Sequence, residues 1–312
     1  MRQGCFRSIL STALLACLLQ APGLAQTASK PGAARKPDPR AETVIFVVTR
    51  TDEKAYVDPI VIISRGKLLA PASTTSREFA RFTSRYYRAG RKYRLLFGGA
   101  ENGSVILKER SGTECLGAQC GAELETGARI NGLVMGVATD SPALGFKSAS
   151  RRAPTQAERA AVASLGRSYF RAKGLAAPAI EKMETINMTA MDLNRDGRAE
   201  IAASFLAETD GRGKALHHIF LIAEPAKASF KQALARYTRT AQKDLPGGGS
   251  LDDVKKYVLS EVLADHIDMD RDGYAEVISA AKGYEGVRYR IYRRVRGEWR
   301  VGFEVYNYRC AY

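Results

Sequence analysis

Two copies of one nine-residue stretch dominate this sequence: Asp192-Leu-Asn-Arg-Asp-Gly-Arg-Ala-Glu200 and, 76 positions later, Asp268-Met-Asp-Arg-Asp-Gly-Tyr-Ala-Glu276. Each copy has side-chain oxygens at its first, third, fifth and ninth positions and a glycine at its sixth. A loop of this kind can surround a hard cation with oxygen ligands, which is the coordination that Ca²⁺ prefers. The sequence therefore predicts two calcium-binding loops.

The residues around each loop distinguish it from an EF-hand. An EF-hand needs a bidentate acid at its twelfth position and a helix on each side, whereas the twelfth residues here are Ala203 and Ser279. The residues that follow each glycine are instead typical of strands, over Glu200–Leu206 and Glu276–Ala281. Each loop is therefore expected to lead directly into a strand.

The loop-then-strand order, with the last acid on the outgoing strand, resembles the calcium loops of FG-GAP and VCBS-type repeats. In that family the first, third, fifth and ninth side chains and the seventh backbone carbonyl hold Ca²⁺. By position, the resemblance implies two ligand sets: Asp192, Asn194, Asp196, Glu200 and the carbonyl of Arg198, then Asp268, Asp270, Asp272, Glu276 and the carbonyl of Tyr274. The family usually builds propeller blades, but a propeller takes at least about four. With two copies, we expect no closed ring from this chain alone.

A metal-free turn is the alternative for each loop, because Asp and Asn bond their own backbone and Gly supplies positive φ. The copies share more than a turn requires, since Arg195 matches Arg271 and the acid at position nine recurs. We therefore favour calcium in a structural role. The second loop carries four carboxylates against three in the first, so it is expected to bind Ca²⁺ more tightly.

The first 25 residues have the three parts of an export signal. They are a basic N-terminus, an apolar run over residues 9–19 and a small-residue cleavage site at Gly23–Ala25. The apolar run is too short to span a bilayer, and no later stretch is long and apolar enough to do so. We expect a periplasmic or secreted protein after removal of residues 1–25. A lipoprotein anchored at Cys17 is less favoured, since a bulky leucine follows that cysteine.

The chain is strongly basic, with 48 Lys and Arg against 33 Asp and Glu and a net charge of +15. Removing the expected signal leaves 46 basic and 33 acidic residues, or +13. Such a charge favours association with anionic polymers. Outside the cytoplasm these are cell-surface polymers or lipids, and we expect no nucleic acid partner. The charge is also explained by solubility alone.

Three of the five cysteines lie outside the expected signal: Cys115, Cys120 and Cys310. In an oxidising compartment, the short spacing of Cys115 and Cys120 favours a local disulfide between them. Cys310 would then be unpaired, although its pairing with either of the other two stays open.

Composition divides the chain into four segments. Residues 1–25 form the signal, and residues 26–41 are short of large apolar side chains, which predicts a disordered linker. Residues 42–150 predict a β-rich N-terminal domain with at least one helix. Residues 151–312 hold both loops together with helical and hairpin patterns. The predicted fold class is therefore α+β, with a C-terminal domain of two calcium-loop and β-hairpin repeats accompanied by helices.

Individual patterns support this division. Apolar and β-branched runs predict strands over residues 43–49, 60–63, 93–97, 104–107 and 130–138. Capping boxes at residues 75–78 and 155–158 predict two helix starts. A third helix is expected from residue 251 to about residue 264, because Leu251, Val254, Val258 and Val262 form one stripe.

Few other residues suggest chemistry. The three histidines, His217, His218 and His266, fit no zinc-protease pattern, and the first two are expected at the surface or in a hairpin. The basic stretch Arg288–Arg296 has two interpretations, a solvated strand face or a docking patch for anions, and both place Arg290 at the surface.

The sequence indicates an exported, non-catalytic calcium-binding protein with a binding or structural role at or near the cell surface. Two alternatives stay open. One is an exported hydrolase of cell-wall or polysaccharide material, with structural calcium and an active site in the N-terminal half. The other is a basic module that docks on an anionic surface polymer or a protein partner. Ca²⁺ is the cofactor expected in each case.

Overall fold

The computed structural model describes residues 42–51, 54–71, 76–110, 122–227, 229–245 and 249–308. In these ranges the protein is mostly β, with fifteen strands and four α-helices. The predicted α+β fold class is therefore wrong. The helical patterns do produce helices, but these are short or lie singly against a sheet and form no layer of their own.

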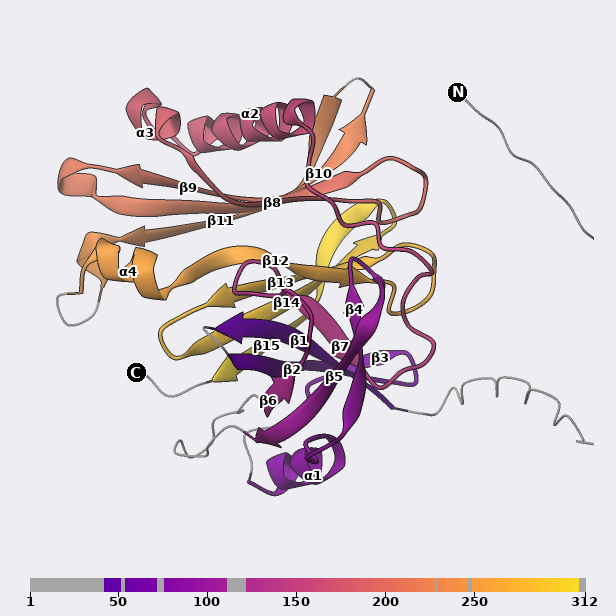
Figure 1. The fold of residues 1–312 in the computed structure, drawn as a ribbon. Coiled ribbons are helices and arrows are strands. Elements are labelled where there is room, and N and C mark those ends of the chain that lie inside the picture. Colours follow the sequence, from indigo (N-terminus) through magenta and orange to yellow (C-terminus); the bar gives the residue numbers. More distant parts are fainter. Residues whose placement is uncertain are drawn as a thin grey trace, which may run out of the picture. The chain divides into compact units, whose positions relative to one another are not determined.

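Residues 43–139 close into a six-stranded antiparallel barrel with one additional strand at its margin (Figure 1). The order around the barrel is β1-β7-β4-β5-β6-β2, and pairing of β1 with β2 closes it, while β3 pairs with β2. The elements are β1 (Thr43–Thr51), β2 (Lys54–Ser64), β3 (Lys67–Leu69), α1 (Ser76–Tyr86), β4 (Lys92–Phe97), β5 (Ala100–Arg110), β6 (Ala122–Glu125) and β7 (Gly136–Thr139). Closure removes the open sheet edges that invite pairing with other chains.

Strand β1 is buried on both of its faces. Val44 and Phe46 pack in a core cluster that includes Phe82 of α1, which lies at one end of the barrel (Figure 1). Ile45 and Val47 pack in a different cluster with residues of the C-terminal half. Because successive side chains of a strand point to opposite faces, a continuous apolar run suits a strand buried on both sides. The strand predicted over residues 43–49 is confirmed.

Residues 184–308 form two four-stranded antiparallel sheets, and each is a simple meander. The first holds β8 (Glu184–Met191), β9 (Glu200–Thr209), β10 (Ala215–Ala226) and β11 (Ser229–Ala241), and the second holds β12 (Leu259–Ile267), β13 (Glu276–Lys282), β14 (Gly286–Val295) and β15 (Glu298–Tyr308). In each sheet an acidic loop connects the first strand to the second. The repeat found in the sequence is thus a repeat of structure.

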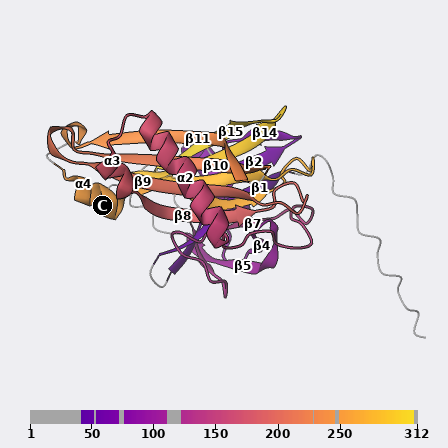
Figure 2. The ribbon, with the colours of Figure 1, turned by 90° about the horizontal axis from the view of Figure 1, so that it is seen from above.

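Helix α2 (Gln156–Ala172) crosses one face of the first sheet (Figure 2). The predicted capping box begins it, since the N–H of Glu158 donates to Thr155 Oγ1 (3.2 Å) and the N–H of Thr155 donates to Glu158 Oε2 (2.7 Å). Gly166 allows the close approach to the sheet, because a Cβ there would lie 2.8 Å from the ring of Phe205. The short helix α3 (Ala177–Glu181) follows.

The helix predicted from residue 251 to about residue 264 ends much earlier. Helix α4 covers Leu251–Tyr257, and β12 begins at Leu259. Val262 is fully buried in β12, which pairs with β13 along its length. The apolar stripe fitted a helix as well as it fitted a strand buried on both faces, and the pairing with β13 decided the outcome. Two short 3₁₀ turns, Gly211–Gly213 and Gln242–Asp244, complete the elements.

The strand predicted over residues 130–138 is also shorter than expected. It is confined to β7, and the residues before it turn around Asn131. The side-chain oxygen of Asn131 accepts hydrogen bonds from the N–H groups of Leu133 and Val134, both at 2.8 Å. This local bonding of an asparagine side chain competes with strand pairing.

Several predictions concern residues outside the described ranges. They are the signal over residues 1–25, its alternative anchor at Cys17, the linker over residues 26–41 and the disulfide between Cys115 and Cys120. The pairing of Cys310 and the cap residue Thr75 belong to the same group. These stay predictions from the sequence.

The barrel and the second sheet share one core cluster. Leu96 and Val137 of the barrel belong to the same cluster as Val262 and Ile291 of the second sheet. Polar contacts accompany this packing, since the hydroxyl of Tyr289 donates to a carboxylate oxygen of Asp58 (2.5 Å). The barrel and the repeats are therefore in contact through buried side chains.

The surface position expected for Arg290 is wrong. Arg290 is 7% exposed, and its guanidinium donates to Glu261 Oε2 (2.8 Å) and Glu304 Oε2 (2.6 Å). The hydroxyls of Ser279 and Tyr292 both donate to Glu261 Oε1 (2.6 Å). This arrangement satisfies a buried carboxylate inside the second sheet. Strand alternation placed Arg290 opposite the apolar face but did not reveal that the first sheet covers that side.

The two neighbouring histidines lie in the β10–β11 hairpin, one of the two expected positions, but they are buried rather than at the surface. His217 and His218 are each 6% exposed in β10. The ring nitrogen Nδ1 of His217 lies 2.6 Å from the hydroxyl of Tyr237 on the adjacent strand. Strand β10 lies between β9 and β11. One of its faces packs in a cluster with Phe170 of α2, and the other packs in a cluster with Tyr292 of the second sheet.

Candidate metal centre

The first acidic loop connects β8 to β9 and is shaped by its own side chains. Asp192 accepts hydrogen bonds from the N–H groups of Asp196 (3.1 Å) and Gly197 (3.0 Å). Arg195 has a φ of 61°, a left-handed conformation that non-glycine residues seldom adopt. The side chain of Glu200, at the start of β9, turns back and accepts from the N–H of Leu193 (3.0 Å).

The second loop, between β12 and β13, repeats most of these features. The N–H of Gly273 donates to Asp268 Oδ2 (3.0 Å), and the N–H of Met269 donates to Glu276 Oε2 (2.7 Å). Arg271 has a φ of 62°, matching Arg195. At position seven, the N–H of Tyr274 donates to Asp272 Oδ1 (2.8 Å). The same bond joins Arg198 to Asp196 in the first loop at 2.8 Å. The shared sequence therefore encodes one backbone conformation twice.

Three acids of the second loop converge. One carboxylate oxygen from each of Asp268, Asp270 and Glu276 lies within 4.8 Å of the other two. Two oxygens on opposite sides of a calcium ion are about 5 Å apart, since each lies 2.3–2.6 Å from the metal. A single Ca²⁺ ion can therefore reach all three. Asp268 Oδ1 is buried and has no hydrogen-bond partner among the described residues.

The electrostatics of this loop suit a cation. Burial raises the pKa of Glu276 to about 7, and the neighbouring charge of Asp270 adds to the effect. Burial also raises the pKa of Asp268, with Asp272 and Asp270 contributing. In the first loop, burial raises the pKa of Glu200. These carboxylates are held together at an electrostatic cost that a bound cation would offset.

The other predicted ligands are not part of this cluster of three acids. In the first loop, Asp196 and Arg198 are exposed, while Asp192 and Asn194 are half-buried. The amide of Asn194 donates to Asp196 Oδ2 (3.0 Å), which ties positions three and five together. In the second loop, Asp272 is exposed and bonded to the backbone of Tyr274. Asp196 and Asp272 thus help to shape the two turns through bonds to the backbone.

Arg293 of β14 is a cation that already contacts the second loop. Its guanidinium donates to Glu276 Oε1 (2.9 Å) and also to Asp270. In the first repeat, the equivalent position is Glu224, because Ile201 faces Ala223 as Val277 faces Tyr292. The two loops thus have side chains of opposite charge beside position nine. Sequence reasoning missed Arg293, because its position depends on the register between β13 and β14.

The two loops touch each other. The hydroxyl of Tyr274 donates to Glu200 Oε1 (3.1 Å), and the N–H of Ala275 donates to the carbonyl of Leu193 (2.8 Å). Close by, Glu224 Oε1 accepts from Arg294 Nε (2.9 Å) and from Trp299 Nε1 (3.0 Å). The loops therefore form one paired structure rather than two separate turns.

A second cluster resembles a catalytic triad in composition. Ser150 Oγ lies 2.8 Å from His266 Nε2, and His266 Nδ1 lies 3.5 Å from Asp265 Oδ1. His266 is 1% exposed, and burial together with Arg151 and Arg195 lowers its pKa to about 3. A general base must accept a proton during the reaction. Burial and the two neighbouring arginines oppose protonation of His266.

The cluster is better explained as a structural connection. Both oxygens of Asp265 accept from the N–H of Gly98 in the barrel (3.1 Å each), and Arg151 lies 3.7 Å from the same carboxylate. The cluster connects three parts of the fold: the barrel, the segment that precedes α2, and strand β12. Sequence reasoning missed the cluster, since its members come together only through the fold.

Comparisons with known proteins give no relative: no protein-family model, curated protein or solved structure matches this chain. Among the described residues, none of the helices has the length and apolar character needed to cross a membrane. Functional inference for this protein therefore depends on the geometry of its own residues.

Proposed function

We propose that this chain is an exported, non-catalytic protein in which the paired acidic loops bind Ca²⁺ and so stabilise a scaffold for binding at or near the cell surface. One observation carries the proposal: two loops 76 residues apart share the bond from the N–H of the glycine to the first aspartate, and in the second loop three acids converge. The resemblance of the loops to those of FG-GAP and VCBS-type repeats is a prediction from the sequence.

The position of the loops supports a structural role for the metal. Each loop connects the first two strands of its sheet, and the loops contact each other through Tyr274 and Glu200. A cation shared among the loop carboxylates would offset their mutual repulsion at this junction. The export signal predicted for residues 1–25 favours a compartment in which calcium is plentiful. Loops of extracellular modules bind calcium with dissociation constants of about 10⁻⁴ to 10⁻³ M.

Thermal unfolding with and without calcium tests the proposal. At free calcium about ten times the dissociation constant, each occupied site adds about 1.4 kcal/mol to the free energy of unfolding. Two sites should therefore raise the melting temperature of the chelator-treated protein by several degrees. Magnesium at the same concentration is the control, because it prefers octahedral geometry and keeps its waters. A melting temperature that is the same in calcium, magnesium and chelator would refute the proposal.

A further inference from the structure

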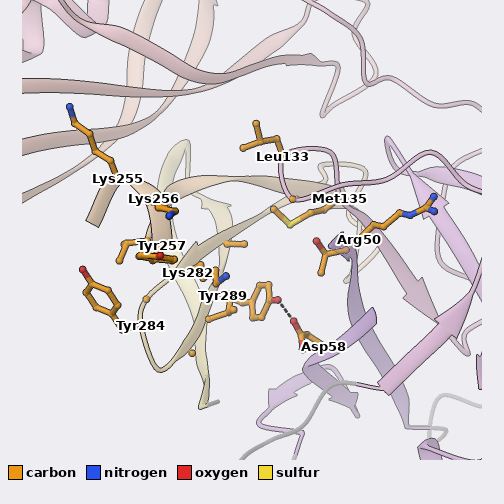
Figure 3. A pocket seen from close by; sticks show the side chains of 17 residues that line it. Arg50, Asp58, Leu133, Met135, Lys255, Lys256, Tyr257, Lys282, Tyr284 and Tyr289 are labelled. Carbon is orange, nitrogen blue, oxygen red and sulfur yellow. Dashed lines mark hydrogen bonds between the residues drawn. The ribbon is translucent and has the colours of Figure 1, made fainter. Parts of the chain in front are cut away.

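A pocket of about 400 Å³ opens between the barrel, the end of α4 and the β13–β14 hairpin (Figure 3). Its floor is buried, since Met135, Ala280 and Tyr289 are 2–3% exposed. Figure 3 shows the hydroxyl of Tyr289 directed at Asp58, to which it donates a hydrogen bond of 2.5 Å. Tyr289 and Asp58 of the floor thus bond to each other, and most of the surface that remains for a ligand is apolar.

Large apolar side chains stand at the mouth of this pocket. Leu133, Tyr257 and Tyr284 are 40%, 50% and 45% exposed. They come from three separate segments: the loop before β7, the end of α4 and the turn between β13 and β14. Exposed apolar side chains that gather around a concave site are a mark of ligand binding rather than of chance exposure.

The charge around the pocket is positive. Arg50, Lys255, Lys256 and Lys282 line it, and Asp58 is its acidic lining residue, fully buried beneath Tyr289. Lys255 is paired with Glu208 of the first sheet, and in Figure 3 its amino group points away from the pocket. Lys256 and Lys282 are exposed. An apolar interior therefore lies beneath a basic rim.

We propose that this pocket binds a small amphipathic anion, an apolar body that ends in one acidic group. The body would lie against Met135, Leu133 and Tyr289, and the acidic group would lie among the lysines of the rim. Lysine acts as a point charge rather than as a planar fork, so a carboxylate and a phosphate head suit this rim equally. The volume falls in the range of pockets for small molecules, about 300–1,000 Å³. The site is independent of the calcium loops.

Calorimetric titration of the full chain with four probes tests the proposal: decanoate, decyl phosphate, decanol and acetate. We expect saturable binding of decanoate or decyl phosphate at least about tenfold tighter than that of decanol, which lacks the charge, and of acetate, which lacks the body. The double variant K256E/K282E should weaken binding of the anionic probe by at least about tenfold. The matched control K182E/K243E changes two exposed lysines that do not line the pocket, and it should bind as the wild type does.

A second variant tests the pocket itself. Gly132 lines the pocket, and a Cβ there would meet no atom within 4 Å, so G132F should fold and fill the mouth. Gly127 has the same freedom outside the pocket, and G127F is its control. Loss of binding in G132F alone supports the proposal. Absence of saturable binding of both anionic probes overturns it. So does equal binding of decanol, or unchanged binding in K256E/K282E or in folded G132F.

Discussion

The hydroxyl of Tyr274 donates a hydrogen bond of 3.1 Å to Glu200 Oε1, and this bond joins the two acidic loops across 74 positions of sequence. Burial raises the pKa of both groups, and Tyr274 also packs edge-on against Trp299 at a ring distance of 5.7 Å. The tyrosine at position seven of the second loop is thus a contact between repeats. The resemblance assigned a role to its carbonyl, and the structure adds one for its side chain.

We predict that Y274F lowers the free energy of unfolding by about 1 kcal/mol, the usual net contribution of one buried hydrogen bond. The ring stays in place against Trp299, so packing is preserved. Urea unfolding measures the loss. Y169F is the control, because Tyr169 is half-buried on α2 and remote in sequence from both loops. Equal stability of Y274F and the wild type would show that the hydrogen bond from Tyr274 to Glu200 contributes nothing.

Arg293 should compete with calcium for the second loop. Its guanidinium contacts the carboxylates of Asp270 and Glu276, which are two of the three converging acids. The second loop has one carboxylate more than the first. The positive charge of Arg293 cancels that difference. We predict that R293M increases the calcium affinity of this loop, by several-fold in a calorimetric titration. R288M is the control, because Arg288 pairs with exposed Glu304. An affinity that falls in R293M would mean that Arg293 orients the ligands instead.

Removal of Arg290 should be costly despite its place in a basic stretch. Its partner Glu261 is 6% exposed and would lose its closer guanidinium, keeping only the longer contact of 3.5 Å with Arg236. Breaking a buried pair in this way costs about 3–5 kcal/mol. We therefore expect R290M to lower the urea midpoint strongly. R300E should change stability by no more than about 0.5 kcal/mol, since Arg300 and Glu298 are both exposed. A small effect of R290M would contradict the buried network.

His218 should make stability depend on pH. Burial lowers its pKa to about 4 in the folded protein, whereas an unfolded histidine titrates near about 6.5. Between these values the unfolded state binds more protons, so the contribution of His218 is complete above pH 6.5 and is lost as the pH falls toward 4. The free energy of unfolding of H218Q should decline less steeply over this range than that of the wild type. Parallel pH profiles for the two proteins would contradict the prediction.

The acidic loops were predictable because their information is local. Nine consecutive residues set the turn, from the aspartates that bond their own backbone to the glycine at position six. The strand after each loop was predictable for the same reason, as was the start of α2 at Thr155. In each case the residues that form the structure are close neighbours in the sequence.

The barrel and the surroundings of the site depend on distant pairings. Closure of the barrel needs β1 to pair with both β2 and β7, and Phe46 lies beside Ala138. No pattern within residues 43–49 reveals those partners. Strand register likewise brings Arg293 and Glu224 to equivalent places beside the two loops. Competition between helix and strand for residues 258–264 was also settled by a partner, β13, that follows in the sequence.

Calcium stoichiometry tests the central claim most directly. Calorimetric titration of chelator-treated protein should give two ions per chain for the wild type, one each for D192A and D268A, and none for the double variant. Circular dichroism in calcium-free buffer would establish that each variant keeps its fold. Binding of no calcium by the folded wild type, or retention of both ions by the folded double variant, would contradict the assignment of the two loops as calcium sites.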